Sequence, residues 1–216
     1  MARWATHGCI LGCTERRVSS LALTDGFLCL VTLWLASRAQ APVALRLACT
    51  LFAVAALLGV LRFSGVYPLP TWHQFASMLG AMAAFPLLAV AVVWPDALVT
   101  RSTRFAWIFM CVMAVLGVLI VGAGQKRVLA DGLAVLSVVA ITVTLARAGL
   151  WRGAMAGGLM LAALLLFAAK VSVAGVLVPG DLLHIGMALG LLGVCTLARW
   201  PQHSGVSTYN HGVPAA

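Results

Sequence analysis

Residues 178–195 read VPGDLLHIGMALGLLGVC, an almost continuously apolar stretch headed by an aspartate and a histidine. From Leu182 to Ala198 nearly every residue is apolar, which is the pattern of a helix that crosses a lipid bilayer. A charged side chain at the centre of such a helix costs about 2.5–3.5 kcal/mol. Asp181 and His184 therefore need a physical reason to stand at the head of this helix.

The whole chain has the composition of a membrane protein. Of its 216 residues, 63% are hydrophobic and 9% are charged, and the mean hydropathy is +1.07. A soluble domain of this length carries far more surface charge, so the soluble class is excluded. The net charge of +9 comes from basic residues scattered between apolar runs. We therefore expect contact with a lipid bilayer and no nucleic-acid partner.

Seven apolar runs, separated by short polar or Pro/Gly-containing connectors, predict an all-α membrane protein that is a bundle of seven transmembrane helices. A polar segment (1–19) precedes them and a polar tail (200–216) follows. The connectors are too short for a second domain, so 20–199 is expected to form one domain. The predicted helices lie at about 20–37, 43–62, 72–94, 104–123, 128–146, 153–172 and 181–199.

Three sequence similarities predict an internal repeat. LTDGFLCL (23–30) resembles LADGLAVL (129–136), and Arg62 and Lys170 each end an apolar helix. His73 and His184 each stand near the start of one. The paired residues are 106, 108 and 111 positions apart, in the same order. The pattern favours a 3+1+3 plan in which repeat A (20–94) and repeat B (128–199) share one orientation and 104–123 joins them.

The distribution of basic residues between the loops is the guide to orientation. Counted over all connectors, Lys and Arg divide evenly between the two sides. Leaving out Arg62 and Lys170 as site residues favours an N-terminus outside and a cytoplasmic C-terminus.

With seven crossings, the unusual polar residues gather on one side of the membrane. The starts of the first, third, fifth and seventh helices and the ends of the second and sixth share that side. The residues placed there are Asp25, Arg62, His73, Asp131, Lys170, Asp181 and His184.

Simpler roles compete for several of these residues. Asp181 follows VPG and has the position of a helix cap, while Arg62 and Lys170 can extend toward the lipid headgroups. For Asp25 a cap fails on length, because a helix from Asp25 to Arg38 would span roughly 18 Å of a roughly 30 Å core. Ser19 or Ser20 is the better predicted cap, which places Asp25 more than one turn inside the helix. Asp131 gives a similar argument.

Two histidines with several aspartates near one membrane face are the ligands that a catalytic metal uses. We predict that His73, His184 and Asp181 hold the metal, and zinc is the expected cofactor. Asp25 and Asp131 are the predicted catalytic carboxylates. Arg62 and Lys170 are their charge partners or hold an anionic group. The expected reaction is hydrolysis of an ester or amide in a lipid-like substrate.

The seven-helix plan, the DLLH start of the last helix and Asp25 resemble the CREST superfamily, which includes the alkaline ceramidases. The resemblance implies a zinc site of three histidines, an aspartate and a serine near one membrane face. This chain departs from that pattern, because the family carries a second histidine four residues after the first in the last helix and Ala188 stands there instead. Ser77 is available for the family's serine.

Other functions remain open. A 3+1+3 plan is also that of the SWEET and PQ-loop carriers, in which paired Asp25/Asp131 and Arg62/Lys170 would couple protons or bind a small anionic solute. No Pro-Gln dipeptide of that family is present within a helix. The polar groups could instead serve an accessory subunit of a membrane complex with an unidentified partner, or His73 and His184 could ligate haem.

Overall fold

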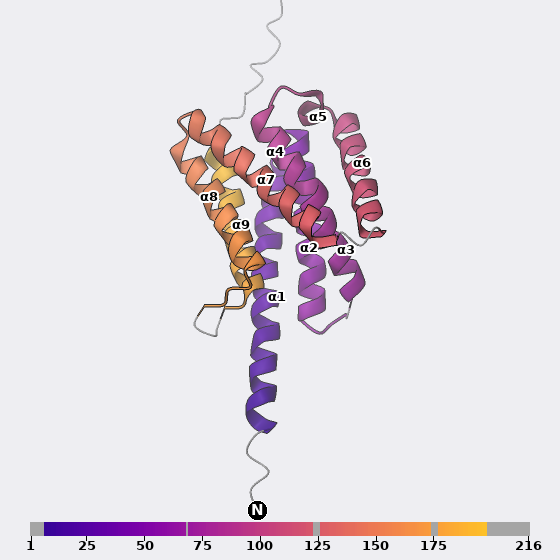
Figure 1. The fold of residues 1–216 in the computed structure, drawn as a ribbon, viewed down its shortest axis with the longest axis vertical. Helices are drawn as coiled ribbons and strands as arrows, with labels where there is room; N and C mark the ends of the chain where they lie inside the picture. The colour runs from indigo at the N-terminus through magenta and orange to yellow at the C-terminus, as the bar shows by residue number, and fades with distance from the viewer. Residues whose placement is uncertain (1–6, 68, 123–125, 174–176, 198–216) are drawn as a thin grey trace, which may run out of the picture.

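A computed structural model describes residues 7–67, 69–122, 126–173 and 177–197. Figure 1 shows its helices packed side by side along the long axis of the molecule. In chain order they are α1 (His7–Ser37), α2 (Val43–Phe63), α3 (Pro70–Leu79), the π-helix η1 (Gly80–Ala84), α4 (Phe85–Val93), α5 (Leu98–Arg101), α6 (Thr103–Gly122), α7 (Lys126–Arg147), α8 (Trp151–Ala168) and α9 (Pro179–Leu197).

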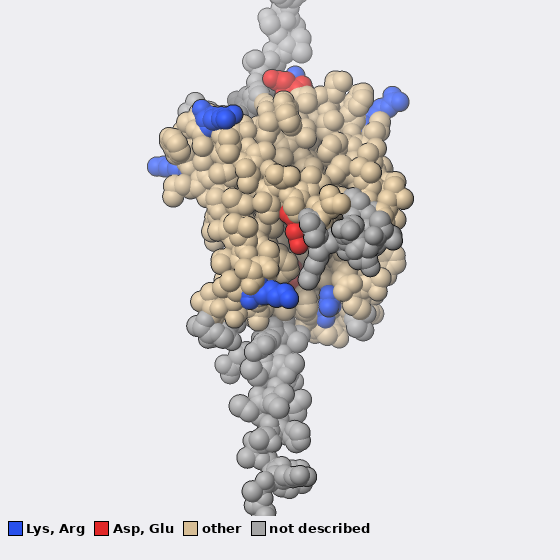
Figure 2. All heavy atoms as spheres, in the orientation of Figure 1, with Lys and Arg blue, Asp and Glu red and all other residues tan. Residues whose placement is uncertain are grey.

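Within the described residues, six segments are long and apolar enough to cross a membrane. They are Ser20–Ser37, Val43–Phe63, Pro70–Val93, Leu129–Arg147, Trp151–Ala168 and Pro179–Thr196. The third segment joins α3, η1 and α4 end to end. Large apolar side chains cover the outside, as lipid contact requires, and on the face shown in Figure 2 the Lys and Arg side chains lie toward the two ends. This is the pattern of a multi-pass integral membrane protein, as the sequence predicted.

The spanning helices form a closed ring. Helix α1 packs against α2 and α9, α2 packs against α3 and α4, and α4 packs against α7. Helix α7 then packs against α8, and α8 against α9, which completes the ring. Helix α6 lies outside this ring, beside α2, α3 and η1, at the right of Figure 1. The ring brings the first and last spans of the chain into contact.

Small residues allow the closest contacts in the ring. Gly186 and Gly193 of α9 lie against alanine side chains of α8, and Gly190 lies against Met160 and the Ala156 carbonyl. Without a hydrophobic force between helices in lipid, such close backbone packing is a main source of association. It holds α9, which carries Asp181 and His184, tightly on α8.

The third span contains one irregular turn. Phe85 donates its backbone N–H to the carbonyl of Gly80, five residues back, which makes η1 a π-helix. Pro86 follows immediately and has no N–H to donate to the helix. Its ring would also collide with the carbonyl four residues earlier in a regular α-helix, and the wider π-turn before it relieves that clash. The turn joins the part of the span that carries His73 to the buried α4.

Some expectations differ from the structure. Helix α1 begins at His7, so residues 7–19 are helical and neither Ser19 nor Ser20 starts the helix. That prediction was wrong because the polar segment before the span continues the helix instead of ending it. The predicted 104–123 helix is α6, which runs from Thr103 to Gly122, and its described apolar part, Thr103–Leu119, is not among the six spans. The seventh span, the repeat and the orientation stay predictions, and the tail (200–216) lies outside the described residues.

Candidate functional site

Asp25 lies inside the bundle, where α1 meets α2. Its side chain is 1% exposed, which is exceptional for an acidic residue in an apolar helix. Gly59 of α2 faces it so closely that a Cβ atom at Gly59 would overlap the carboxylate. The carboxylate therefore occupies space that any other residue at position 59 would fill.

His184 of α9 lies next to Asp25. Its Nδ1 is 3.2 Å from Oδ1 of Asp25, and its side chain is 16% exposed. The contact does not have hydrogen-bond geometry, and Nδ1 of His184 has no hydrogen-bond partner among the described residues. The other carboxylate oxygen of Asp25, Oδ2, has none either. Buried polar atoms are nearly always paired, so this unpaired couple marks the place as a candidate site.

Asp181 has a different role from its neighbour Asp25. Its carboxylate accepts hydrogen bonds from Ser20 Oγ (3.1 Å) and Thr24 Oγ1 (2.9 Å), both on α1. It also accepts the backbone N–H of Val178 (3.1 Å), just before α9 begins, so the predicted capping role is confirmed. These three bonds occupy most of the acceptor positions of the carboxylate and fasten the start of α9 to α1.

His73 of α3 lies on the far side of the same region. Its Nδ1 is 3.3 Å from the carbonyl of Ala55 on α2, and its ring meets the edge of Phe63 at 5.5 Å. Because a carbonyl only accepts, Nδ1 carries the proton and Nε2 keeps its lone pair. The rings of His73 and His184 are close enough to interact electrostatically, as are His73 and Arg62.

Two predicted site residues lie elsewhere. Asp131 is exposed on α7, which packs against α4 and α8 and has no substantial contact with α1 in the described structure. Lys170 is exposed in the turn after α8, with φ of 55°. The structure therefore brings together Asp25, Arg62, His73, Asp181 and His184, and leaves Asp131 and Lys170 outside this cluster.

The cluster is near one end of the bundle. Asp25, His73 and His184 each follow the first residue of their span by no more than five residues, and Gly59 precedes the end of its span by four. At about 1.5 Å per residue these positions lie about 5–8 Å inside the spans.

The sequence did not indicate the residues that support the cluster. Gly59 is one of many glycines in apolar runs, here in LLGVLRF, and Thr24 simply precedes Asp25, so neither pattern indicated a role in the cluster. Among the described residues, no three His, Cys, Asp or Glu side chains stand close enough together to hold a metal as they are. Comparison with family models, with curated proteins and with solved structures gives no match.

Proposed function

We propose that this chain is a membrane-embedded hydrolase, in which Asp25, His73 and His184 bind a zinc ion and a lipid-like ester or amide is cleaved. The observation that carries the proposal is the unpaired contact between Asp25 and His184. His184 Nδ1 lies 3.2 Å from Asp25 Oδ1, and Nδ1 and the other carboxylate oxygen, Oδ2, have no hydrogen-bond partner among the described residues, an arrangement that a shared cation would satisfy.

The spacing of this contact suits zinc. Ligand atoms about 2.0–2.1 Å from a tetrahedral zinc ion stand about 3.3 Å from each other. The Oδ1–Nδ1 distance between Asp25 and His184 is 3.2 Å. The pair therefore has the separation expected of two neighbouring ligands.

His73 is the proposed third ligand. Metal-binding histidines usually donate their other ring N–H to a carbonyl or carboxylate, as His73 does to Ala55. No set of three ligands is assembled among the described residues, so His73 would complete a zinc site with Asp25 and His184 only after a change in the orientation of its ring. The resemblance to the CREST superfamily stays part of this proposal, with one histidine fewer than that family uses.

The remaining residues divide the work. Bound zinc would supply a water of lowered pKa, about 7, and polarise a carbonyl. Asp25 offers a second, unpaired oxygen, Oδ2, that can accept a proton. Asp181 accepts three hydrogen bonds and positions α9 on α1, while Arg62 adds positive charge near His73.

The substrate class follows from depth. The cluster lies about 5–8 Å inside one end of the spans by residue count, and we infer that this is shallow enough for the ester or amide linkage of a membrane lipid to reach it. A soluble substrate would have to leave water to reach it, whereas a lipid already places its linkage there. We therefore assign the proposed reaction to a lipid-like ester or amide.

Seven crossings are part of the proposal, and the order of the spans supports them. Helices α1 and α9 begin at the same end of the bundle, since Ser20 and Thr24 bond to Asp181. Two spans with the same direction need an odd number of crossings between them. Helices α2, α7 and α8 and the α3–α4 span make four, so α6 supplies the fifth.

Elemental analysis of the purified full-length protein tests the function. We expect about one zinc per chain, lost in His184→Ala and in Asp25→Asn and reduced in His73→Ala. Asp131→Asn, a change of the same chemistry at the exposed α7 position, is the matched control and should keep the metal. Purified, folded protein without bound metal, even after incubation with zinc, would contradict the proposed zinc-dependent hydrolase.

A proton-coupled carrier is the alternative that the same pair would support. Asp25 and His184 are close enough to exchange a proton within a spanning bundle. This function requires uptake of a solute into vesicles that depends on a proton gradient and is lost in Asp25→Asn, with no bound metal.

A further inference from the structure

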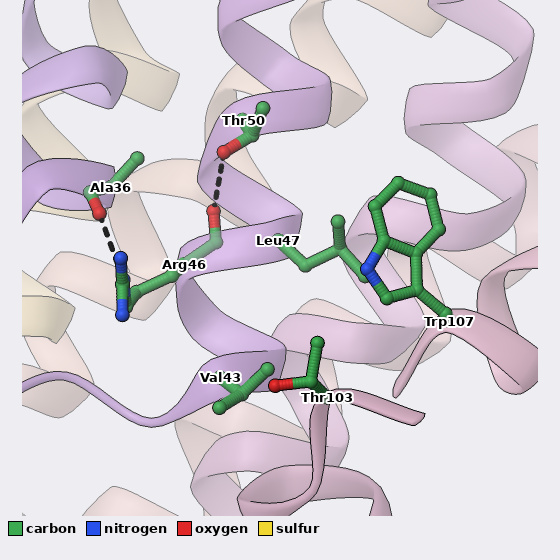
Figure 3. A pocket seen from close by; sticks show the side chains of 7 residues that line it. All are labelled: Ala36, Val43, Arg46, Leu47, Thr50, Thr103 and Trp107. Carbon is green, nitrogen blue, oxygen red and sulfur yellow. Dashed lines mark hydrogen bonds between the residues drawn. The ribbon is translucent and has the colours of Figure 1, made fainter. Parts of the chain in front are cut away.

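A groove at the end of the bundle opposite the Asp25 cluster is formed by three helices. It encloses about 250 Å³ and is lined by Ala36 of α1, by Val43, Arg46, Leu47 and Thr50 of α2, and by Thr103 and Trp107 of α6. Figure 3 shows the α2 residues between Ala36 on one side and Trp107 on the other. Val43 and Thr103 each begin a helix, so the groove lies at the membrane boundary.

Arg46 is held in place at the edge of this groove. Its Nε donates a hydrogen bond to the carbonyl of Ala36 at 3.1 Å, which fixes the guanidinium beside the end of α1 (Figure 3). The two terminal nitrogens, with four N–H groups, have no protein partner in the part of the chain that the structure describes. Nearby, Arg101 is paired with Asp96, and Arg38 lies over the ring of Trp34. Arg46 therefore presents an oriented guanidinium whose terminal N–H groups are available to a ligand.

The rest of the groove is apolar and continues toward the membrane interior. Leu47 lines the groove, and Trp107, which is 50% exposed, forms its α6 wall. Val54 and Leu57 follow on the same face of α2 at helical spacing and are 48% and 50% exposed. A cation at the membrane boundary above a lipid-facing apolar strip matches the two parts of a phospholipid.

We propose that this groove binds one anionic phospholipid, with its phosphate on Arg46 and an acyl chain along Leu47 and Val54. A guanidinium with free N–H groups recognises a phosphate by charge-assisted hydrogen bonds. Asp96 is engaged by Arg101, and no carboxylate of the described residues lines the groove to pair with the cation of a zwitterionic headgroup. The volume fits a headgroup or a chain segment, with the remainder of the lipid in the bilayer.

Native mass spectrometry of the full-length protein, released from bilayers of equal phosphatidylglycerol and phosphatidylcholine, tests the proposal. We expect one retained phosphatidylglycerol per chain, with about tenfold less in Arg46→Gln. Arg104→Gln is the matched control, because Arg104 is exposed on α6 one residue beyond Thr103 and does not line the groove. It should retain the lipid within about twofold.

Additional variants show whether the apolar wall and the charge of Arg46 both contribute to lipid retention. Trp107→Ala should weaken retention of both lipids, because it removes an apolar wall, and Arg46→Lys should retain more lipid than Arg46→Gln. A melting temperature of Arg46→Gln close to that of the unchanged protein shows that the variant is folded. Equal retention of the two lipids, equal loss in both glutamine variants, or displacement of the lipid by millimolar inorganic phosphate would overturn the proposal.

Discussion

Gly59 of α2 stands directly against the carboxylate of Asp25 on α1, with no room for a β-carbon between the two helices. Asp25 is thereby pressed between a helix backbone and His184, and its burial depends on a residue four positions from the end of the second span. The acidic residue and the glycine act as one unit.

Replacing Gly59 by alanine should displace the Asp25 carboxylate. We expect a loss of stability of about 1–3 kcal/mol, as for other overpacked sites, together with loss of bound zinc. Unfolding in detergent and elemental analysis measure the two effects. Gly158→Ala is the control, because a β-carbon there meets no atom within 4 Å, and it should be neutral or stabilising by up to about 1 kcal/mol. Equal behaviour of the two variants would show that the close approach is not required.

Thr24→Val should loosen the attachment of α9 to α1. The substitution keeps the shape of the side chain and removes a hydroxyl that donates to Asp181 at 2.9 Å. A buried acceptor left short of a donor costs about 1–3 kcal/mol. Thermal unfolding compares it with Thr196→Val, whose hydroxyl bonds to its own helix on an exposed face and should change stability by less than about 0.5 kcal/mol.

The number of crossings can be read from the sidedness of three connectors. In a chain stripped of its six cysteines, Asp96→Cys and Ala148→Cys should react with an impermeant thiol reagent from one side of the membrane, and Val66→Cys from the other. All three positions are exposed in connectors between helices. Ala148→Cys and Asp96→Cys reacting from opposite sides would mean that α6 does not cross.

Asp131→Asn and Lys170→Gln should leave zinc content and hydrolysis within about twofold of the unchanged protein. Both residues are exposed and stand apart from the Asp25 cluster. The contrast with Asp25→Asn is informative because Asp25 and Asp131 occupy matching positions in the predicted repeat. Loss of activity in Asp131→Asn would require the two halves of the bundle to share one site.

The sequence predicted the spans closely, because a bilayer requires a minimum length and an apolar composition, and both can be read directly from the sequence. The second span was expected at 43–62 and is found at Val43–Phe63. Asp25 could be selected for the same reason, since a helix capped there would be too short to cross. These inferences depend on one helix at a time.

What the sequence could not supply is how the helices are rotated and which ones touch. Asp25 and Asp131 follow the same local pattern, yet one is buried against α2 and the other faces outward from α7. Thr24 and Asp181 meet across 157 residues of chain, and Gly59 matters through a backbone contact. Such pairings arise from the closed ring, and periodicity within a single helix carries no information about it.

Closing the ring between α1 and α9 also has a consequence for biosynthesis. Asp25 enters the membrane with α1, and His184 follows only with α9, later in the chain. Until α9 is made, Asp25 lies in the bilayer without its partner, and a chain that stops before α9 would leave it unmatched. Synthesis of α9 is therefore needed before the buried acid meets its histidine.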